Sequence, residues 1–466
     1  MMSKKRDGKL LYFALSIGIS LGGIKTKRTQ ACWIRFERGE DSVDDHVLYH
    51  VFEAAQKLSD FHDNQDYMKL MQINRAFAKA GEDYFFKNTH SITLDESDGY
   101  FVVSGYKRNG TKSFTLFNTE PDFFINILEL LRDFDVPVRD IDISNFPPFC
   151  MEPRILEILA SFSYVQNLTM FPSCLCEGPC PLMKPNLNCV TYMTTSAFLS
   201  FKNLHITNVS MYIRCIKQAM RVALRRMEED GNSRTVSEND AYMDLLQNIG
   251  HVDNLTFLDA NVYYLPFIFV RELILRMQVK CLKLTPCESP FGWDFGFATE
   301  IGCIDRGPLS MWPDSEEKIP IENLFFMSVN KVITEDNFVY CSSNLIKWFE
   351  CTKCLTIEYS GIEDMEAFQE KLLRFRTVFK GPYPIQKVTL RLFVQRPPDV
   401  PTEPPLQQKS YIEEFSMDLR RKYILFGYEN VIIKTPINPR TIEAVVYGYD
   451  KEITLNITIM GTFVNI

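Results

Sequence analysis

The sequence lacks an excess of basic residues. Its 51 Lys and Arg are outnumbered by 59 Asp and Glu, which gives a net charge of −8. Proteins that bind nucleic acid or anionic membranes through their overall field carry the opposite balance. The charge composition therefore argues against nucleic acid as a partner, and it gives no support to a membrane surface.

Catalytic motifs of fixed spacing are missing as well. The chain contains no P-loop, no G-x-S-x-G elbow, no H-E-x-x-H helix and no dinucleotide fingerprint after a strand. His46 and His50 would share a helix face, but no third ligand has a fixed spacing from them. We therefore expect a protein that is not an enzyme and needs no cofactor, with an unrecognised enzyme as the alternative.

The sequence offers little that could span a membrane. Residues 10–24, LLYFALSIGISLGGI, follow the basic stretch KKRDGK and precede Lys25, Lys27 and Arg28. This pattern resembles a signal peptide or a short anchor, whereas a membrane-spanning helix needs about 20 apolar residues. The interpretations left open are a targeting segment, an element packed on the fold, and a mis-set start codon.

Cysteine is too sparse for a small disulfide scaffold. The 13 cysteines are spread over 466 residues, which favours reduced core thiols and a cytoplasmic or nuclear location. Five Asn-x-Ser/Thr sequons point the other way, at Asn109, Asn167, Asn208, Asn254 and Asn456. If residues 1–24 target the chain to the secretory pathway and the sequons are used, the alternative is a secreted or membrane-anchored extracellular repeat protein.

Four cysteines gather in one short stretch. Cys174, Cys176, Cys180 and Cys189 are close enough in sequence to form a tetrahedral zinc site. Their spacing lacks the paired C-x₂-C knuckles of structural zinc modules. We favour a loop of reduced thiols and expect no metal.

What the sequence does contain is a recurring pattern: an aliphatic residue, two mostly polar residues, then apolar-x-apolar. Full copies are VRDIDI (138–143), VQNLTM (165–170), VDNLTF (252–257), VKCLKL (279–284), IENLFF (321–326) and IQKVTL (385–390). Looser copies are NTHSITL (88–94), FKNLHI (201–206) and TKCLTI (352–357). Each alternates like a half-buried strand and usually follows a helix-like stretch.

The repeat is irregular in length. Its central apolar residues stand at positions 92, 141, 168, 204, 255, 282, 324, 355 and 388. A unit of strand, connector and helix cannot bury both faces alone, so neighbouring units must stack. This predicts an irregular, leucine-rich-repeat-like α/β solenoid; one compact α/β domain is the alternative.

Composition suggests where the parts of the chain begin and end. QRPPDVPTEPPLQQ (395–408) contains five prolines and indicates an extended linker. In the sequence after this linker, apolar and polar residues alternate with a period of two, as they do in strands. We predict an N-terminal apolar and basic segment (1–40), a helical module (41–90), the solenoid (91–394), a Pro-rich linker (395–410) and a β-rich cap (411–466).

One expected helix is unevenly charged. Arg214, Lys217, Arg221 and Arg225 recur at spacings of three or four residues. Such a stripe is typical of a solvated outer helix face, and the alternative is a ridge that binds an acidic partner.

The helical module has a sequence resemblance. VDDHVLYHVFEAA (43–55) and DYMKLMQINRAFAKAGEDYFFKN (66–88) follow the apolar spacing of the F-box, ending in the V-x-R-x-W/F signature at Ile73, Arg75 and Phe77. An F-box-like module ahead of degenerate leucine-rich-type repeats resembles the F-box families expanded in nematodes.

That resemblance implies a function. F-box modules bind the Skp-type adaptor of a cullin-RING ubiquitin ligase, and the larger domain recruits a protein substrate. The expected adaptor-binding residues are Val43, Val47, Leu48, Val51, Phe52, Leu70, Ile73 and Phe77. The resemblance thus predicts the substrate-recognition subunit of an SCF-type E3 ligase.

Overall fold

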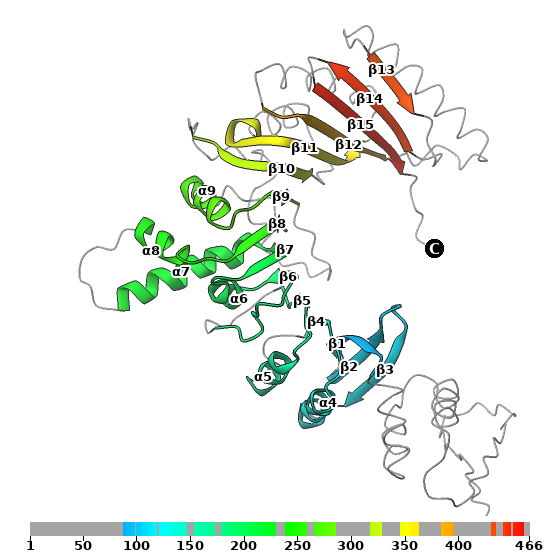
Figure 1. Ribbon diagram of the computed structural model, residues 1–466, viewed down its shortest axis with the longest axis vertical. Coiled ribbons are helices and arrows are strands. Elements are labelled where there is room, and N and C mark those ends of the chain that lie inside the picture. Colours follow the sequence, from blue (N-terminus) through cyan, green and yellow to red (C-terminus); the bar gives the residue numbers. More distant parts are fainter. Residues whose placement is uncertain are drawn as a thin grey trace, which may run out of the picture. The chain divides into compact units, whose positions relative to one another are not determined.

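The computed structural model describes residues 87–97, 99–118, 121–146, 153–172, 179–229, 238–258, 265–285, 317–328, 345–362, 384–395, 430–434, 441–448 and 451–460 (Figure 1). The described residues form a mixed α/β structure. The chain divides into two compact units, Met1–His90 with Tyr100–Pro137, and Ser91–Gly99 with Val138–Ile466. Residues 100–137 therefore group with the first unit, whereas the sequence places the start of the repeats at residue 91.

The described part of the first unit is a hairpin and a helix. Strands β2 (Tyr100–Lys107) and β3 (Lys112–Asn118) pair antiparallel, and helix α4 (Pro121–Asp133) follows them. Gly110 has a φ of 78° in the hairpin turn, a conformation that favours glycine. Phe124 of α4 packs on Phe101 of β2 with ring centroids 5.9 Å apart.

The second unit contains the remaining strands. They are β1 (Thr89–Ser97), which begins at the unit boundary, β4 (Asp140–Asn145), β5 (Asn167–Thr169), β6 (Cys189–Met193), β7 (His205–Met211), β8 (His251–Phe257), β9 (Cys281–Leu284), β10 (Ile319–Ser328), β11 (Phe349–Ile362), β12 (Lys387–Gln395), β13 (Asn430–Lys434), β14 (Thr441–Gly448) and β15 (Lys451–Met460).

The sheet of the second unit follows chain order along most of its length. Its strands lie in the order β1-β4-β5-β6-β7-β8-β9-β10-β11-β12-β15-β14-β13. Every pairing from β1 through β12 to β15 is parallel. The last two pairings, β15 with β14 and β14 with β13, are antiparallel.

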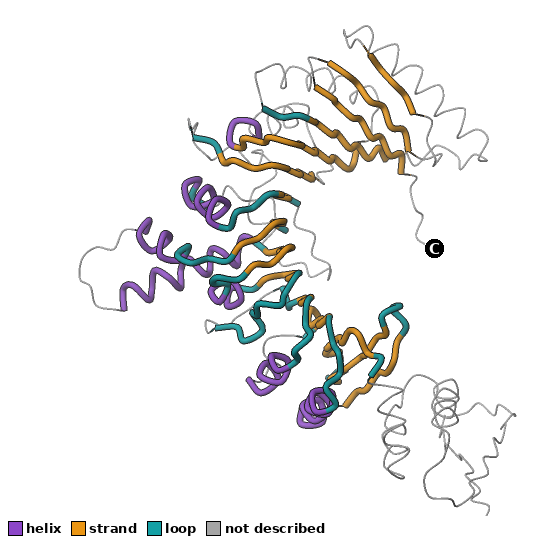
Figure 2. Tube along the Cα trace, in the orientation of Figure 1, coloured by secondary structure: helices purple, strands orange, loops and turns teal. Residues whose placement is uncertain are grey.

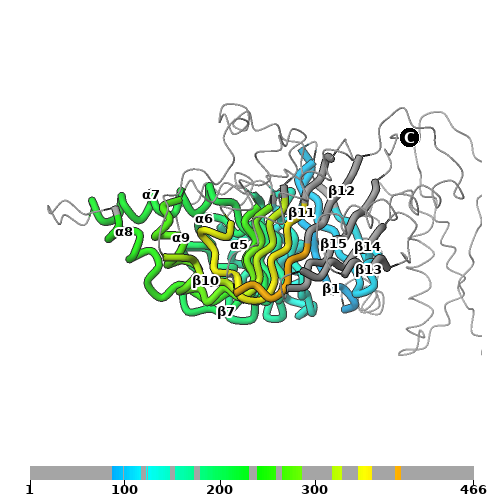
Figure 3. The backbone as a smooth tube through the Cα atoms, turned by 90° about the horizontal axis from the view of Figure 1, so that it is seen from above, coloured from blue at the N-terminus to red at the C-terminus, as the bar shows by residue number. Residues whose placement is uncertain are grey.

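Helices fill several of the connections between these strands. They are α5 (Pro153–Ser161), α6 (Thr195–Ser200), α7 (Ile213–Glu229), α8 (Glu238–Leu245) and α9 (Phe267–Arg276). In the second unit they lie on one side of the strands (Figures 2 and 3). Parallel neighbours need such crossover connections, and the helices cover one face of the sheet.

The repeat pattern predicts the strand register at eight of its nine copies. The residues Ile92, Ile141, Leu168, Val190, Val209, Leu255, Leu282, Leu324, Leu355, Val388 and Ile453 pair in succession across the sheet. From Ile92 to Val388 each is at most 2% exposed. We call these residues the central row; from Ile92 to Val388 its side chains form a buried core.

The ninth copy of the pattern is misplaced. FKNLHI puts Leu204 at the centre of a strand, but the strand is β7, whose central residue is Val209. The overlapping segment ITNVSM (206–211) fits the same pattern. Phe201, the first residue of the predicted copy, caps α6 instead and is fully buried.

Three C-terminal strands lie in the region predicted as a β-rich cap. β13, β14 and β15 all fall within residues 411–466, and β15 extends the parallel sheet beside β12. Apart from residue 395, the predicted linker 395–410 lies outside the described residues. No helix in the described ranges is long and apolar enough to cross a membrane. Residues 10–24 lie outside those ranges.

Candidate functional site

Two rows of side chains flank the central row. Because side chains alternate along a strand, residues just before and just after the central row face the side opposite the buried core. The preceding residues, which we call the amide row, are Ser91, Asp140, Asn167, Cys189, Asn208, Asn254, Cys281, Asn323, Cys354 and Lys387. The following residues, the hydroxyl row, are Thr93, Asp142, Thr169, Thr191, Ser210, Thr256, Lys283, Phe325, Thr356 and Thr389.

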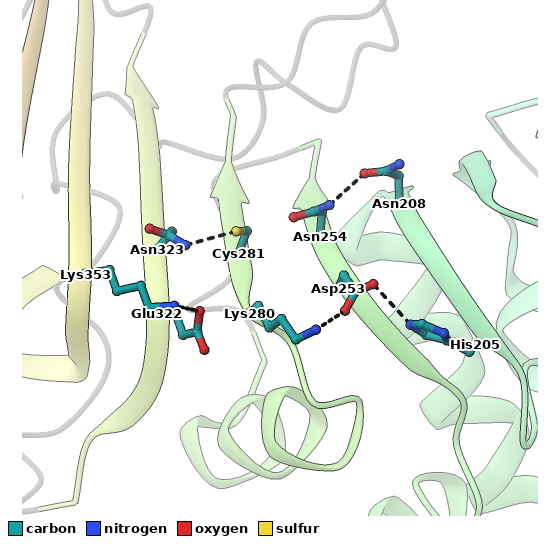
Figure 4. Close-up of polar contacts among 9 residues, drawn as sticks. All are labelled: His205, Asn208, Asp253, Asn254, Lys280, Cys281, Glu322, Asn323 and Lys353. Atoms are coloured by element: carbon teal, nitrogen blue, oxygen red, sulfur yellow. Dashed lines mark hydrogen bonds and ion pairs between the residues drawn. The ribbon is translucent and has the colours of Figure 1, made fainter.

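The amide row carries hydrogen bonds from strand to strand. The Asn254 side-chain amide donates to Oδ1 of Asn208 at 2.9 Å, and that of Asn323 donates to Sγ of Cys281 at 3.3 Å (Figure 4). Asn167 donates to Oδ1 of Asp140 at 2.5 Å. These bonds connect neighbouring repeats through side chains as well as through the backbone.

The two rows also explain most of the sequons. An Asn in the amide row and a hydroxyl residue in the hydroxyl row stand two positions apart, which spells Asn-x-Ser/Thr at residues 167–169, 208–210 and 254–256. Asn109 lies in the β2–β3 turn, where its Oδ1 accepts a bond from the Thr111 backbone N–H. Three of the five sequons are thus products of the repeat.

Charged side chains form a second set of cross-strand contacts beside the amide row. Asp253 accepts a bond from Lys280 at 2.7 Å and lies 3.1 Å from Nε2 of His205, while Lys353 pairs with Glu322 at 2.6 Å (Figure 4). The Lys280 hydrogen bond lowers the pKa of the Asp253 carboxyl, and His205 adds a smaller effect. The charges at β8–β11 therefore alternate and neutralise each other in pairs.

The sheet face has one irregularity, between β6 and β7. Val190 pairs with Val209 and Met193 pairs with Met211, so Thr191 and Tyr192 stand opposite the single residue Ser210. This is a β-bulge, which is rare in parallel pairs and re-aims a side chain. Tyr192 has a φ of 58°, which costs an L-residue about 1–2 kcal/mol.

Side chains hold Tyr192 in this conformation. Its backbone N–H donates to Oγ of Ser210 at 3.2 Å, and its ring stacks on Tyr212 with centroids 6.0 Å apart and planes 10° apart. The guanidinium of Arg214 lies 4.7 Å from the Tyr212 centroid and donates to the Pro172 carbonyl at 3.0 Å. The result is a Tyr192–Tyr212–Arg214 stack at the carboxyl ends of β6 and β7.

All four residues of the predicted basic ridge lie on α7. Their surroundings differ. Arg221 and Arg225 are exposed and Lys217 is half-buried. Arg214, at the first turn, belongs to the tyrosine stack. Sequence spacing thus found one participant of that stack but not Tyr192 or Tyr212.

The bulge also explains why the regular repeat pattern does not predict β6. LNCVTYM (187–193) is a copy of the repeat with one residue inserted after Thr191, so Met193 falls one position later than the pattern requires. The segment fits the repeat pattern once a single inserted residue is allowed. Nothing in the local sequence indicates that the inserted residue meets Tyr212.

Other predicted sites are only partly described. The eight adaptor-binding candidates from Val43 to Phe77 lie outside the described residues, as do Cys174 and Cys176. Cys180 is buried and Cys189 is half-buried in β6. In the described part of the chain, no three His, Cys, Asp or Glu residues gather as a metal site would require.

No protein-family model matches the sequence, and no match was found among the curated proteins or the solved structures.

Proposed function

We propose that this chain is a protein-interaction scaffold and the substrate-recognition subunit of an SCF-type E3 ubiquitin ligase, acting in the cytoplasm or nucleus and not itself an enzyme. In this proposal the second unit is a degenerate leucine-rich-type solenoid whose outward strand face binds a protein substrate. The F-box-like module in residues 41–90 binds a Skp-type adaptor and, through it, a cullin-RING ligase.

One observation carries the proposal. The central row keeps an apolar residue in register on successive parallel strands, while the amide and hydroxyl rows beside it vary. A sheet face with this division can change its outward side chains without disturbing the core. Such a surface suits recognition of another protein, and the F-box resemblance supplies the ligase.

The amide contacts support an intracellular role over a glycosylated one. The side chains of Asn208 and Asn254 bond to each other within a regular ladder of strands, not in a loop. Glycans attach to asparagines on accessible surface loops. If the chain were nevertheless secreted and glycosylated, its mass would fall after enzymatic deglycosylation.

The proposal is tested by capture of a purified Skp-type adaptor on the full chain. We expect stoichiometric capture by the native protein and loss of capture in the double variant Leu48→Asp, Phe52→Asp, because charged residues would replace expected apolar anchors. The control is Arg221→Ala, Arg225→Ala on the exposed face of α7, which should capture the adaptor normally. A folded native chain that captures no adaptor would refute the ligase proposal.

A further inference from the structure

The outward face of the second unit differs in charge from one end to the other. At β8–β11 the carboxylates of Asp253 and Glu322 are each bonded to a lysine. At β1 and β4 the face carries Asp95 and Asp142, which directly follow the buried residues Leu94 and Ile141. Among the described residues, no Lys or Arg forms an ion pair with either of these two.

Asp142 lies between β1 and β6 on the outward face. The strand register places it there: Asp142 pairs with Thr93 of β1 and with Thr169 of β5, and Thr169 pairs with Thr191, the residue before Tyr192. Burial raises the pKa of the Asp95 carboxyl most, and the Asp142 carboxylate adds a smaller rise. Burial likewise raises the pKa of the Tyr192 phenol, and Asp142 again adds a smaller rise.

Tyr192 adds an aromatic ring to this end of the face, two strands from Asp142. Tyr192 is the extra residue of the β6 bulge, which stands with Thr191 opposite Ser210, so its side chain does not follow the regular alternation of the strand. The ring is half-buried, and Tyr212 supports it in a parallel stack. The guanidinium of Arg214 already lies over the Tyr212 ring.

We propose that the outward face around Tyr192 and Asp142 binds a cationic side chain, arginine or lysine, from a basic segment of the protein partner. The proposal rests on the recognition role proposed above for the strand face and adds the chemistry of the partner. The aromatic ring attracts the cation through its quadrupole, and the carboxylate of Asp142 accepts a charge-assisted hydrogen bond from it. The cation also relieves the repulsion between Asp95 and Asp142.

Charge complementarity also orients the bound segment along the strand face. The paired charges at β8–β11 present no excess of either sign in their contacts, while the β1–β4 end is acidic. Complementary potentials steer encounter and set orientation more than they set raw affinity. A basic segment therefore docks with its cation at the β1–β4 end.

The test uses the full chain and three fluorescein-labelled peptides: GSRGSRGSRGSR, and matched versions with Glu or Gln in place of each Arg. Binding is followed by fluorescence anisotropy at low and at moderate salt. We expect the arginine peptide to bind, the other two to bind at least tenfold more weakly, and the difference to shrink as salt rises.

Variants locate the binding. Asp142→Asn keeps an oxygen for the Ser144 backbone N–H, which Oδ1 accepts at 2.9 Å, but removes the charge; it should weaken binding about tenfold. Tyr192→Leu should weaken it about threefold, while Tyr192→Phe, which keeps the ring, should bind as the native chain does. Glu228→Gln, an exposed position on α7, removes the same charge from the helix side and should change nothing.

Equal binding of all three peptides, or equal weakening by Asp142→Asn and Glu228→Gln, would overturn the proposal. If Tyr192→Leu fails to fold by circular dichroism, Asp142→Asn and Tyr192→Phe decide the question. Adaptor capture separates this inference from the ligase proposal: a chain that captures the adaptor but ignores the arginine peptide refutes only the inference.

Discussion

Two neighbouring steps of the sheet, β7 to β8 and β6 to β7, are built differently on the same core. From β7 to β8 the register runs from His205 opposite His251 to Met211 opposite Phe257. From β6 to β7 it breaks after Val190 and resumes at Met193, with Tyr192 in the left-handed region. The central row is buried at both steps.

The comparison separates what the core requires from what the outward face is free to vary. At the regular step the outward side chains bond across strands, as Asn254 does with Asn208. At the bulged step the hydroxyl of Ser210 instead accepts a bond from the Tyr192 backbone, and an aromatic ring is re-aimed. An inserted residue thus changes the surface while Val190 and Met193 stay fully buried.

The largest effect should come from the central row. Leu255 is fully buried between Val209 and Leu282, so Leu255→Ala should lower the free energy of unfolding by about 2–5 kcal/mol through lost burial and the cavity left behind. Urea denaturation followed by circular dichroism measures the loss. The matched control is Thr256→Ala, the next residue on the outward face, which should stay within about 0.5 kcal/mol. Similar losses at the two positions would break the division between core and surface.

A smaller effect is expected where β7 and β8 begin. Gly250 donates its backbone N–H to the Phe201 carbonyl at 2.9 Å, and a Cβ added to it would overlap the Phe201 ring and the Leu204 carbonyl. Gly250→Ala should therefore destabilise the protein by about 1–3 kcal/mol.

The Phe201→Leu variant sharpens that prediction. If the Phe201 ring is the obstacle, the losses of Gly250→Ala and Phe201→Leu should be less than additive in the double variant, because the smaller side chain makes room for the methyl group. Strict additivity in a double-mutant cycle would show that the close approach at Gly250 does not set the start of β8.

The smallest effect concerns the charged contacts of the regular step. Asp253→Asn should lower stability by about 0.5–1 kcal/mol at pH 7, since the pair with Lys280 is partly exposed. The folded-state pKa of Asp253 is lowered, so its contribution is complete above the ordinary carboxyl pKa of 3.8 and is lost as pH falls through the folded value.

Denaturation midpoints at pH 7 and pH 3 check this prediction. The gap between native protein and Asp253→Asn should narrow at the lower pH, and adding Lys280→Gln to Asp253→Asn should cost little more at either pH. A gap that stays constant with pH would mean that the charge of Asp253 contributes nothing to the regular step.

Much of the ladder could be predicted from the sequence. The alternation around Ile141, Leu255 and Leu324 is local, and a strand with one buried face must follow it. The pattern failed where it was ambiguous, as at Leu204 against Val209, and where an insertion interrupted it, as at Tyr192. It also identified Arg214 as one of a charged stripe without indicating its aromatic neighbour.

The sequence by itself determined which residues occupy the core of most strands, because burial imposes a period of two on each regular copy of the repeat. Only the tertiary structure decided which outward residues meet. The contacts of Asn254 with Asn208, and of Tyr192 with Tyr212, join residues from different repeats whose separation along the chain varies. Their meeting depends on the register between strands and on one bulge, which local periodicity does not encode.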